Sequence, residues 1–88
     1  MSTLGEVRTM DKLINIANRA VADYGFRQTV MYGAEDIAQR AGFSQQEQDI
    51  LASTVVDFLT ALPIPVQPAD IPSEQQRMEE AIKAAAGG

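Results

Sequence analysis

The side chains that could carry out chemistry in this chain of 88 residues are few, because the sequence contains no histidine and no cysteine. Imidazole bases, thiol nucleophiles, disulfides and the usual structural zinc sites are therefore excluded. Two adjacent carboxylate pairs are present, Glu35 with Asp36 and Glu79 with Glu80. Neighbouring residues on a helix point about 100° apart and do not converge on one substrate atom. We therefore expect these pairs to lie on solvated faces.

Hydroxyl nucleophiles are equally poorly supported. Ser44 and Thr54 have no histidine or nearby lysine to activate them. No carboxylate spacing matches a calcium loop, and no glycine pattern matches a phosphate-binding loop. The sequence predicts a chain that is not an enzyme, has no cofactor and no metal site, and acts by binding.

The charge of the chain bears on its partner. Seven Lys and Arg residues against 12 Asp and Glu residues give a net charge of −5. The first 40 residues are balanced, whereas the segment between Arg40 and Arg77 holds five acidic residues and no basic one. Binding to a phosphate backbone depends on Lys and Arg. Nucleic acid is therefore disfavoured, and a protein is the expected partner.

Length and composition predict one small globular domain, since 45% of the residues are apolar and 22% are charged. A chain of this size buries only about 60% of the surface that its unfolded form exposes, so a second copy would add stability and a homodimer is one option. No apolar run is long enough to span a membrane, and the first residues do not resemble a secretion signal. The expected location is the cytoplasm.

The elements that position the side chains are predicted to be helices. Apolar residues at helical spacing indicate helices over about 3–24, 29–41 and 44–62. Gly25 is expected to close the first helix, because glycine readily adopts the left-handed conformation of a C-terminal cap. Gly33 is expected to loosen or kink the second helix.

The clearest local signal lies between the second and third helices. Gly42 is predicted to cap the end of one helix, and Ser44 with Glu47 has the spacing of a capping box that begins the next. Pro63 is expected to end the third helix, because proline lacks the backbone donor that a helix requires.

Four prolines between residues 63 and 72 predict a stiff, extended connector. Ser73 with Gln76 predicts the cap of a last helix, whose narrow apolar side suggests weak docking. The predicted fold is therefore all-α, a small three-helix bundle with a proline-rich linker and a weakly docked fourth helix. The chain divides into the bundle (1–62), the linker (63–72) and the last helix with its Gly-Gly tail (73–88).

Two groups of apolar residues are candidates for binding a partner. Aromatic residues beside an arginine gather around the glycine-marked turns, where they either form a partner-binding patch or plug the ends of the bundle. Aliphatic residues alternate with prolines in the linker, where they either dock on a partner or cover the core of this chain. The candidate partner-binding residues are Tyr24, Phe26, Arg27, Tyr32, Phe43, Ile64, Val66 and Ile71.

Residues 13–44 contain three segments with a familiar order: Ile-Ala at 16–17, Tyr-Gly-Phe at 24–26, and the IA-x-x-AG-x-S pattern at 37–44. This order resembles the amino-terminal half of tetracycline-repressor-type DNA-binding domains. The resemblance implies a helix-turn-helix regulator, with the helix after residue 44 entering the major groove. That helix carries three carboxylates and no cation before Arg77, which opposes contact with phosphates.

A longer resemblance covers residues 10–51. Residues 23–27 read D-x-x-F-R, and residues 42–51 read G-F-S-x-x-E-x-x-x-L. These motifs resemble leader domains of ribosomally synthesised peptide natural product precursors, of the nitrogen-fixation-associated and nitrile-hydratase-like type. Gly87 and Gly88 are similar to the double-glycine site after which such leaders are cut. The resemblance implies a non-catalytic recognition domain held by a modifying enzyme or exporter. A small helical subunit of an enzyme complex is a further alternative.

Overall fold

The structure is a computed structural model that describes the backbone of residues 2–87 and the side chains of residues 10–87. Gly88, and with it half of the Gly-Gly tail, lies outside the described residues. The helices form the following series: α1 (Ser2–Ala22), α2 (Tyr24–Ala41), α3 (Gln45–Ile50), η1 (Leu51–Val55), α4 (Val56–Ala61), η2 (Pro68–Asp70) and α5 (Ile71–Ala85). The described residues contain no strand. The predicted all-α fold is confirmed.

The third helix is continuous from α3 through η1 to α4. η1 is a π-helical turn, in which the backbone N–H of Val56 donates to the carbonyl of Leu51, five residues earlier. Both flanking residues, Ile50 and Val56, keep right-handed helical dihedral angles. The three segments therefore form one helix. This helix ends at Ala61, just before Pro63, as predicted.

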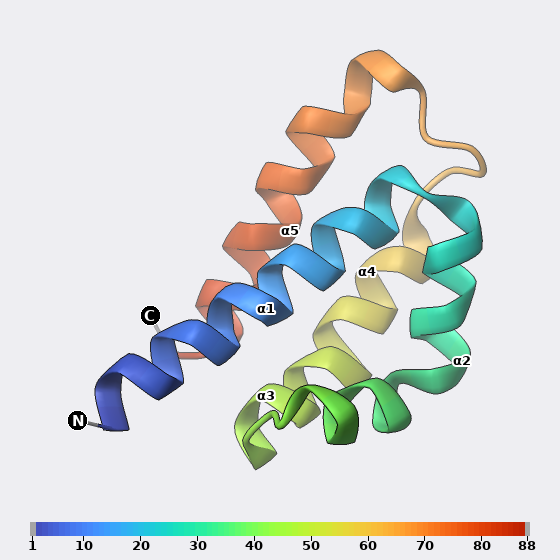
Figure 1. The fold of residues 1–88 in the computed structure, drawn as a ribbon. Helices are drawn as coiled ribbons and strands as arrows, with labels where there is room; N and C mark the ends of the chain where they lie inside the picture. Colours follow the sequence, from blue (N-terminus) through green and yellow to red (C-terminus); the bar gives the residue numbers. More distant parts are fainter. Residues whose placement is uncertain (1, 88) are drawn as a thin grey trace.

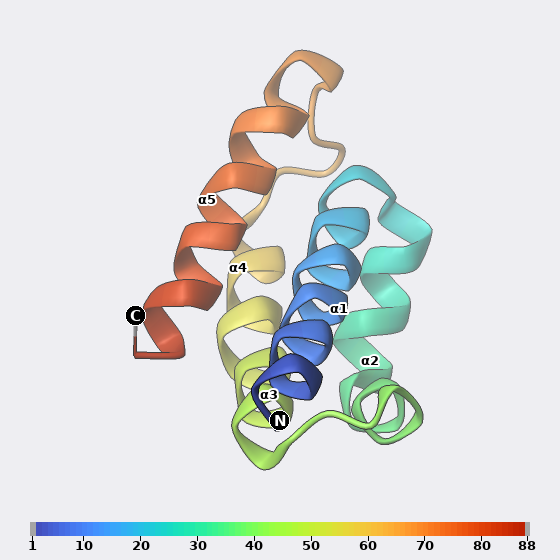
Figure 2. The same ribbon diagram turned by 60° about the vertical axis from the view of Figure 1, so that its left-hand side comes forward.

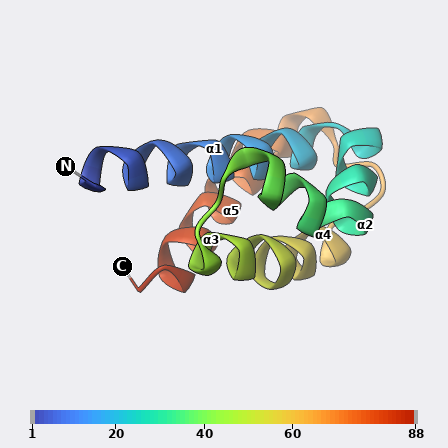
Figure 3. The same ribbon diagram turned by 60° about the horizontal axis from the view of Figure 1, so that its bottom comes forward.

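The helices form a bundle in which α1 and α5 lie side by side and run in opposite directions (Figures 1 and 2). α1 also packs against α2, and the third helix packs against both α2 and α5. The start of α1 and the end of α5 lie toward the same side of the molecule (Figure 3). The linker between α4 and α5 loops over the opposite end, beside the corner where α1 ends and α2 begins (Figure 1).

One apolar core joins α1, α2, α3, η1, α4 and α5. Its members come from both ends of the chain, so the last helix belongs to the same core as the first. One residue of the linker is also a member. The buried apolar residues are Leu13, Ala17, Ala20, Val21, Val30, Ala38, Ile50, Leu51, Val55, Leu59, Leu62, Val66, Met78 and Ile82. No helix of the described part of the chain is long and apolar enough to cross a membrane.

The last helix is docked more firmly than the sequence predicted. Met78 and Ile82 are both 0% exposed, and the side chain of Gln75 donates a hydrogen bond of 2.9 Å to the backbone oxygen of Asn18 in α1. Fully burying one such apolar side chain contributes about 1.5–3 kcal/mol. The expectation of weak docking is therefore wrong, because two deeply buried side chains suffice to hold a narrow apolar face.

The first two helices meet at Asp23 and not at Gly25. Asp23 has extended backbone angles (φ −129°, ψ 109°), and its carboxylate accepts the N–H of Phe26 at 3.1 Å. Asp23 is thus the N-cap of α2, and α2 begins at Tyr24, earlier than the predicted start near residue 29. The predicted kink at Gly33 is confirmed, since its angles (φ −133°, ψ 27°) are not helical.

The turn between α2 and α3 is formed as predicted. Gly42 has a left-handed backbone (φ 74°), and the N–H of Phe43 donates to the carbonyl of Ala38 at 3.0 Å. The hydroxyl of Ser44 accepts the N–H of Glu47 at 3.2 Å, and the Glu47 carboxylate accepts the N–H of Ser44 at 2.9 Å. Both reciprocal bonds of a capping box are therefore present.

The last helix begins differently from the prediction. α5 starts at Ile71 with Asp70 in the N-cap position, and Ser73 donates its hydroxyl to the backbone oxygen of Asp70 at 3.1 Å. Pro72 lies in the first turn, where its missing N–H needs no helical acceptor. Ser73 is therefore inside the helix and does not cap it.

Candidate binding site

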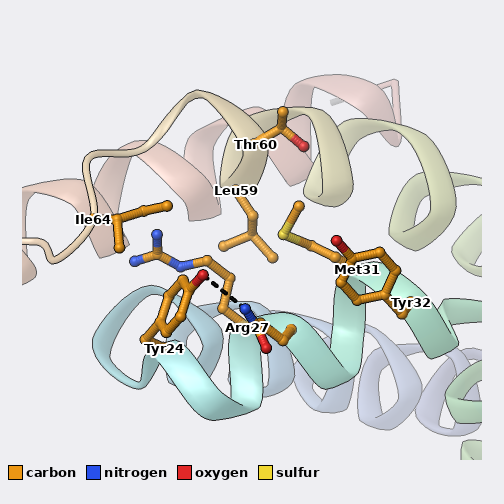
Figure 4. Close-up of a pocket in the computed structure, with 8 residues that line it drawn as sticks. Tyr24, Arg27, Met31, Tyr32, Leu59, Thr60 and Ile64 are labelled. Carbon is orange, nitrogen blue, oxygen red and sulfur yellow. Dashed lines mark hydrogen bonds between the residues drawn. The ribbon is translucent and has the colours of Figure 1, made fainter.

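A hollow of about 250 Å³ opens between α2 and α4 (Figure 4). Its wall is formed by one side of α2, by the last turns of the third helix and by one residue of the linker. The lining residues are Tyr24, Arg27, Gln28, Met31, Tyr32, Leu59, Thr60 and Ile64. Within the described side chains, the exposed large apolar residues are Tyr32 (84% exposed), Ile64 (68%) and Tyr24 (42%), and all three line this hollow.

Tyr24 is held in place at one end of the hollow. Its hydroxyl accepts a hydrogen bond of 2.7 Å from the side-chain amide of Gln28, one helical turn later. The guanidinium carbon of Arg27 lies 5.4 Å from the centre of the tyrosine ring, within the range of a cation–π contact. These contacts hold the ring at the end of the hollow where Figure 4 also shows the Arg27 guanidinium and Ile64.

Arg27 joins three parts of the fold. Its side chain is buried, and it donates to the backbone oxygens of Ala20 and Val21 at 3.4 Å each and of Pro63 at 3.1 Å. Ala20 and Val21 lie in the last turn of α1, where carbonyls lack helical donors and the helix dipole attracts a cation. Arg27 therefore fixes the linker against the corner between α1 and α2 and so positions Ile64.

The floor of the hollow is apolar and carries no negative charge. Leu59 is 1% exposed and Met31 is half-buried, and the hydroxyl of Thr60 is occupied by a hydrogen bond of 2.8 Å to the backbone oxygen of Val56. No carboxylate is among the lining residues. The site is thus a depression with an apolar floor, with Arg27 as its one charged lining residue and with a tyrosine toward each end.

The structure brings four of the eight predicted partner-binding residues to this hollow and places the other four against the core. Phe26 is half-buried, with the guanidinium carbon of Arg19 at 4.2 Å from its ring centre. Phe43 and Ile71 are also half-buried and pack on the core, and Val66 is buried within it. Val66 and Ile71 therefore cover the core, whereas Ile64 is exposed, and its docking on a partner stays a prediction.

Four lining residues were not singled out from the sequence. Gln28 and Met31 lie on the same side of α2 as the two tyrosines, because positions three, four, seven and eight residues apart share a helix face. That spacing would have identified them if the start of α2 had been placed at Tyr24. Leu59 and Thr60 belong to another helix, and no signal in the sequence connects them to α2.

A second, smaller hollow of about 110 Å³ lies between α4 and α5. Arg77 and Glu74 form an ion pair of 2.8 Å at its edge, and the Arg77 guanidinium carbon lies 5.7 Å from the ring centre of Phe58. These side chains bind each other. The hollow between α2 and α4 is therefore the stronger candidate.

The carboxylate pairs that were considered for chemistry lie apart from the hollow. Glu35 and Asp36 are exposed, and Asp36 pairs with Arg40 at 3.1 Å. Glu79 pairs with Lys83 at 2.9 Å and, through this hydrogen bond and its charge, raises the pKa of Lys83 above the usual value. No group of three or more potential metal ligands occurs in the described part of the chain.

No family model matches this chain, and comparisons with curated proteins and with solved structures give no match. The functional interpretation therefore rests on the geometry of the hollow and on the chemistry of its side chains.

Proposed function

We propose that this chain is a non-catalytic protein-recognition module in the cytoplasm, leader-like or adaptor-like, that a modifying enzyme or another protein binds at the hollow between α2 and α4. The observation that carries the proposal is the gathering of Tyr24, Tyr32 and Ile64, which are exposed, around one depression. Tyrosine is enriched at the centres of protein interfaces, where its ring buries a large area while its hydroxyl finds a polar partner.

The size and charge of the hollow favour a protein over other ligands. Its volume of about 250 Å³ lies below the range of roughly 300–1,000 Å³ that is usual for small-molecule pockets. Its only charged lining residue is Arg27, whose guanidinium is engaged by backbone carbonyls. A partner therefore gains mainly from apolar contact with Tyr32 and Ile64, as in the centre of a protein interface.

The residues that carry the leader resemblance act structurally in this fold. In the first motif, Asp23 caps α2 and Arg27 anchors the linker. In the second motif, Gly42 ends α2, and Ser44 with Glu47 caps α3. A leader-like function would therefore use the first motif to build the corner that presents the exposed Tyr24, and the second motif to build the turn at the other end of α2.

The experiment compares three forms of the tagged chain in a lysate of the cells that make it. The hollow variant is Tyr32→Ser with Ile64→Ser, and the matched control is Gln39→Ser with Ala69→Ser, which changes exposed residues on the same helix and linker outside the hollow. We expect a protein that the wild type and the control capture and the hollow variant does not. With that protein purified, calorimetry should show binding at least about tenfold weaker for the hollow variant.

Three other outcomes would contradict the proposal or favour an alternative function. If every captured protein binds the hollow variant as well as the wild type, the proposal is wrong. Binding to duplex DNA that weakens steeply with salt would favour a helix-turn-helix regulator. If addition of the chain restores the activity of an incomplete enzyme complex and the hollow variant does so equally well, the chain is a structural subunit instead.

A further inference from the structure

The surface around the hollow contains both a projection and a depression. Ile64 is 68% exposed and stands between two exposed prolines, Pro63 and Pro65, at the rim. Beside it, Leu59 and Met31 form the apolar floor (Figure 4). When such features adjoin, a two-fold rotation about an axis between them can place the projection of each copy over the depression of the other, so that both copies use the same patch, as in an isologous interface.

The distribution of charge allows two copies to meet at this face. Each copy carries a net charge of −5, so most approaches between copies are repulsive. α2, which forms most of the hollow, is balanced, with Arg27 and Arg40 against Glu35 and Asp36, and no carboxylate lines the depression. Contact through this face therefore brings together surfaces without net negative charge on two acidic molecules.

The exposed area sets the strength of such a contact. Tyr24, Tyr32 and Ile64 are 42%, 84% and 68% exposed. At roughly 200 Å² for each side chain, they supply roughly 400 Å² per copy, half of the ~800 Å² per partner in a stable complex. The neighbouring prolines add to this area. The contact therefore belongs to the weak, reversible class of interfaces.

From these three observations we infer that the hollow binds a second copy of this chain, in a two-fold dimer in which Ile64 of each copy lies on the Leu59 and Met31 floor of the other. This inference goes beyond the proposed function, because it needs no foreign partner. It also has a regulatory consequence, since a partner that uses the same hollow binds only the monomer. The apparent affinity for that partner therefore falls as the concentration of the chain rises.

Sedimentation equilibrium tests the association directly. Between about 10 µM and about 1 mM, a range that covers weak dissociation constants, we expect the average mass to rise from 9.5 kDa toward twice that value. Raising salt to about 0.5 M, where the Debye length is about 4 Å, should strengthen the dimer by about twofold or more, because like charges are screened. A monomer at every concentration would overturn the inference.

Variants locate the contact. Tyr32→Ser and Ile64→Ser should each weaken the dimer by about tenfold, and Gln39→Ser and Ala69→Ser should leave it unchanged. The altered side chains are exposed, so all four variants should remain folded, which circular dichroism checks. A dimer that persists in both hollow variants would place the interface elsewhere and contradict the inference.

Disulfide formation between introduced cysteines tests the geometry of the dimer. The chain has no native cysteine that could form a competing disulfide. We expect an equimolar mixture of the Ile64→Cys and Thr60→Cys variants to form a mixed disulfide on mild oxidation, because both residues line the hollow and a disulfide requires Cα atoms within about 7 Å. Ile64→Cys mixed with Ala52→Cys, an exposed site in η1, is the control. Equal yields in the two mixtures would refute the two-fold arrangement.

The two proposals fail separately. A chain that stays monomeric but loses its partner through Tyr32→Ser with Ile64→Ser retains the proposed function and loses only the dimer. A chain that dimerises through the hollow, while every captured protein binds the hollow variant, retains the dimer and loses the proposed function.

Discussion

Two sides of the bundle differ in how far their apolar residues are exposed. Where α5 packs against α1 and η1, Met78 and Ile82 are completely buried. Between α2 and α4, Tyr32 and Ile64 remain mostly exposed around the hollow. The first contact removes apolar area from water within the chain and so stabilises the fold, whereas the second leaves that area exposed to water, where we propose that another molecule binds.

We therefore expect different residues to determine the stability of the fold and the binding of another molecule. Residues of the α1–α5 contact should change the free energy of unfolding, and residues around the hollow should change binding alone. Arg27 lies between the two classes, because it lines the hollow while its guanidinium donates to backbone oxygens of α1 and of the linker. Substitutions at these positions therefore test whether the two regions differ in this way.

The largest effect is expected at Met78. Met78→Ala removes a fully buried side chain from the core and should lower the free energy of unfolding by about 2–5 kcal/mol, the range for such truncations. Urea denaturation followed by circular dichroism measures it, with the exposed Glu80→Ala as control. A loss below about 1 kcal/mol would mean that α5 contributes little to the fold.

Arg27→Met should have the next largest effect. Methionine preserves most of the apolar stem but leaves the backbone oxygens of Ala20, Val21 and Pro63 without their donor. We expect a loss of about 2 kcal/mol, less than the sum of three charged hydrogen bonds because a buried charge is also removed. The matched control, Arg40→Met, breaks only an exposed ion pair and should cost less than about 0.5 kcal/mol. If the two variants are equally stable, Arg27 does not anchor the linker to the corner between α1 and α2.

Asp23→Ala should cost about 1 kcal/mol, because the N-cap of α2 loses the acceptor for the N–H of Phe26. Asp23→Asn keeps a side-chain oxygen and should recover most of this loss. Thermal unfolding of the three forms provides the comparison. Equal destabilisation by alanine and asparagine would show that the charge of Asp23, and not its capping bond, matters.

The smallest effect on stability is expected at Tyr32, where binding should change most. Tyr32 is 84% exposed, so Tyr32→Ser should shift the free energy of unfolding by no more than about 0.5 kcal/mol. The same variant should weaken the dimer and the partner complex. A destabilisation above about 1 kcal/mol would indicate that Tyr32 supports the fold, and the separation of the two regions would fail.

The boundary between α1 and α2 at Asp23 shows where prediction from local sequence patterns fails. Both Asp23 and Gly25 are residues that commonly interrupt helices, and helical spacing alone favours a boundary at Gly25. In the fold, Asp23 caps α2, and Arg27, four residues later, supplies donors to the last carbonyls of α1. No glycine cap is then required. The choice depended on a contact that the local pattern does not display.

The helical class, the kink at Gly33 and the turn from Gly42 to Glu47 could be predicted from local patterns, since these follow from helical spacing and from hydrogen bonds between residues close in the chain. The depth to which α5 is buried and the choice of apolar residues that meet depend on how the helices pack. Leu59 and Ile64 join Tyr24 and Tyr32 because α4 and the linker pack beside α2, and the energy of that packing depends on the shapes of distant side chains.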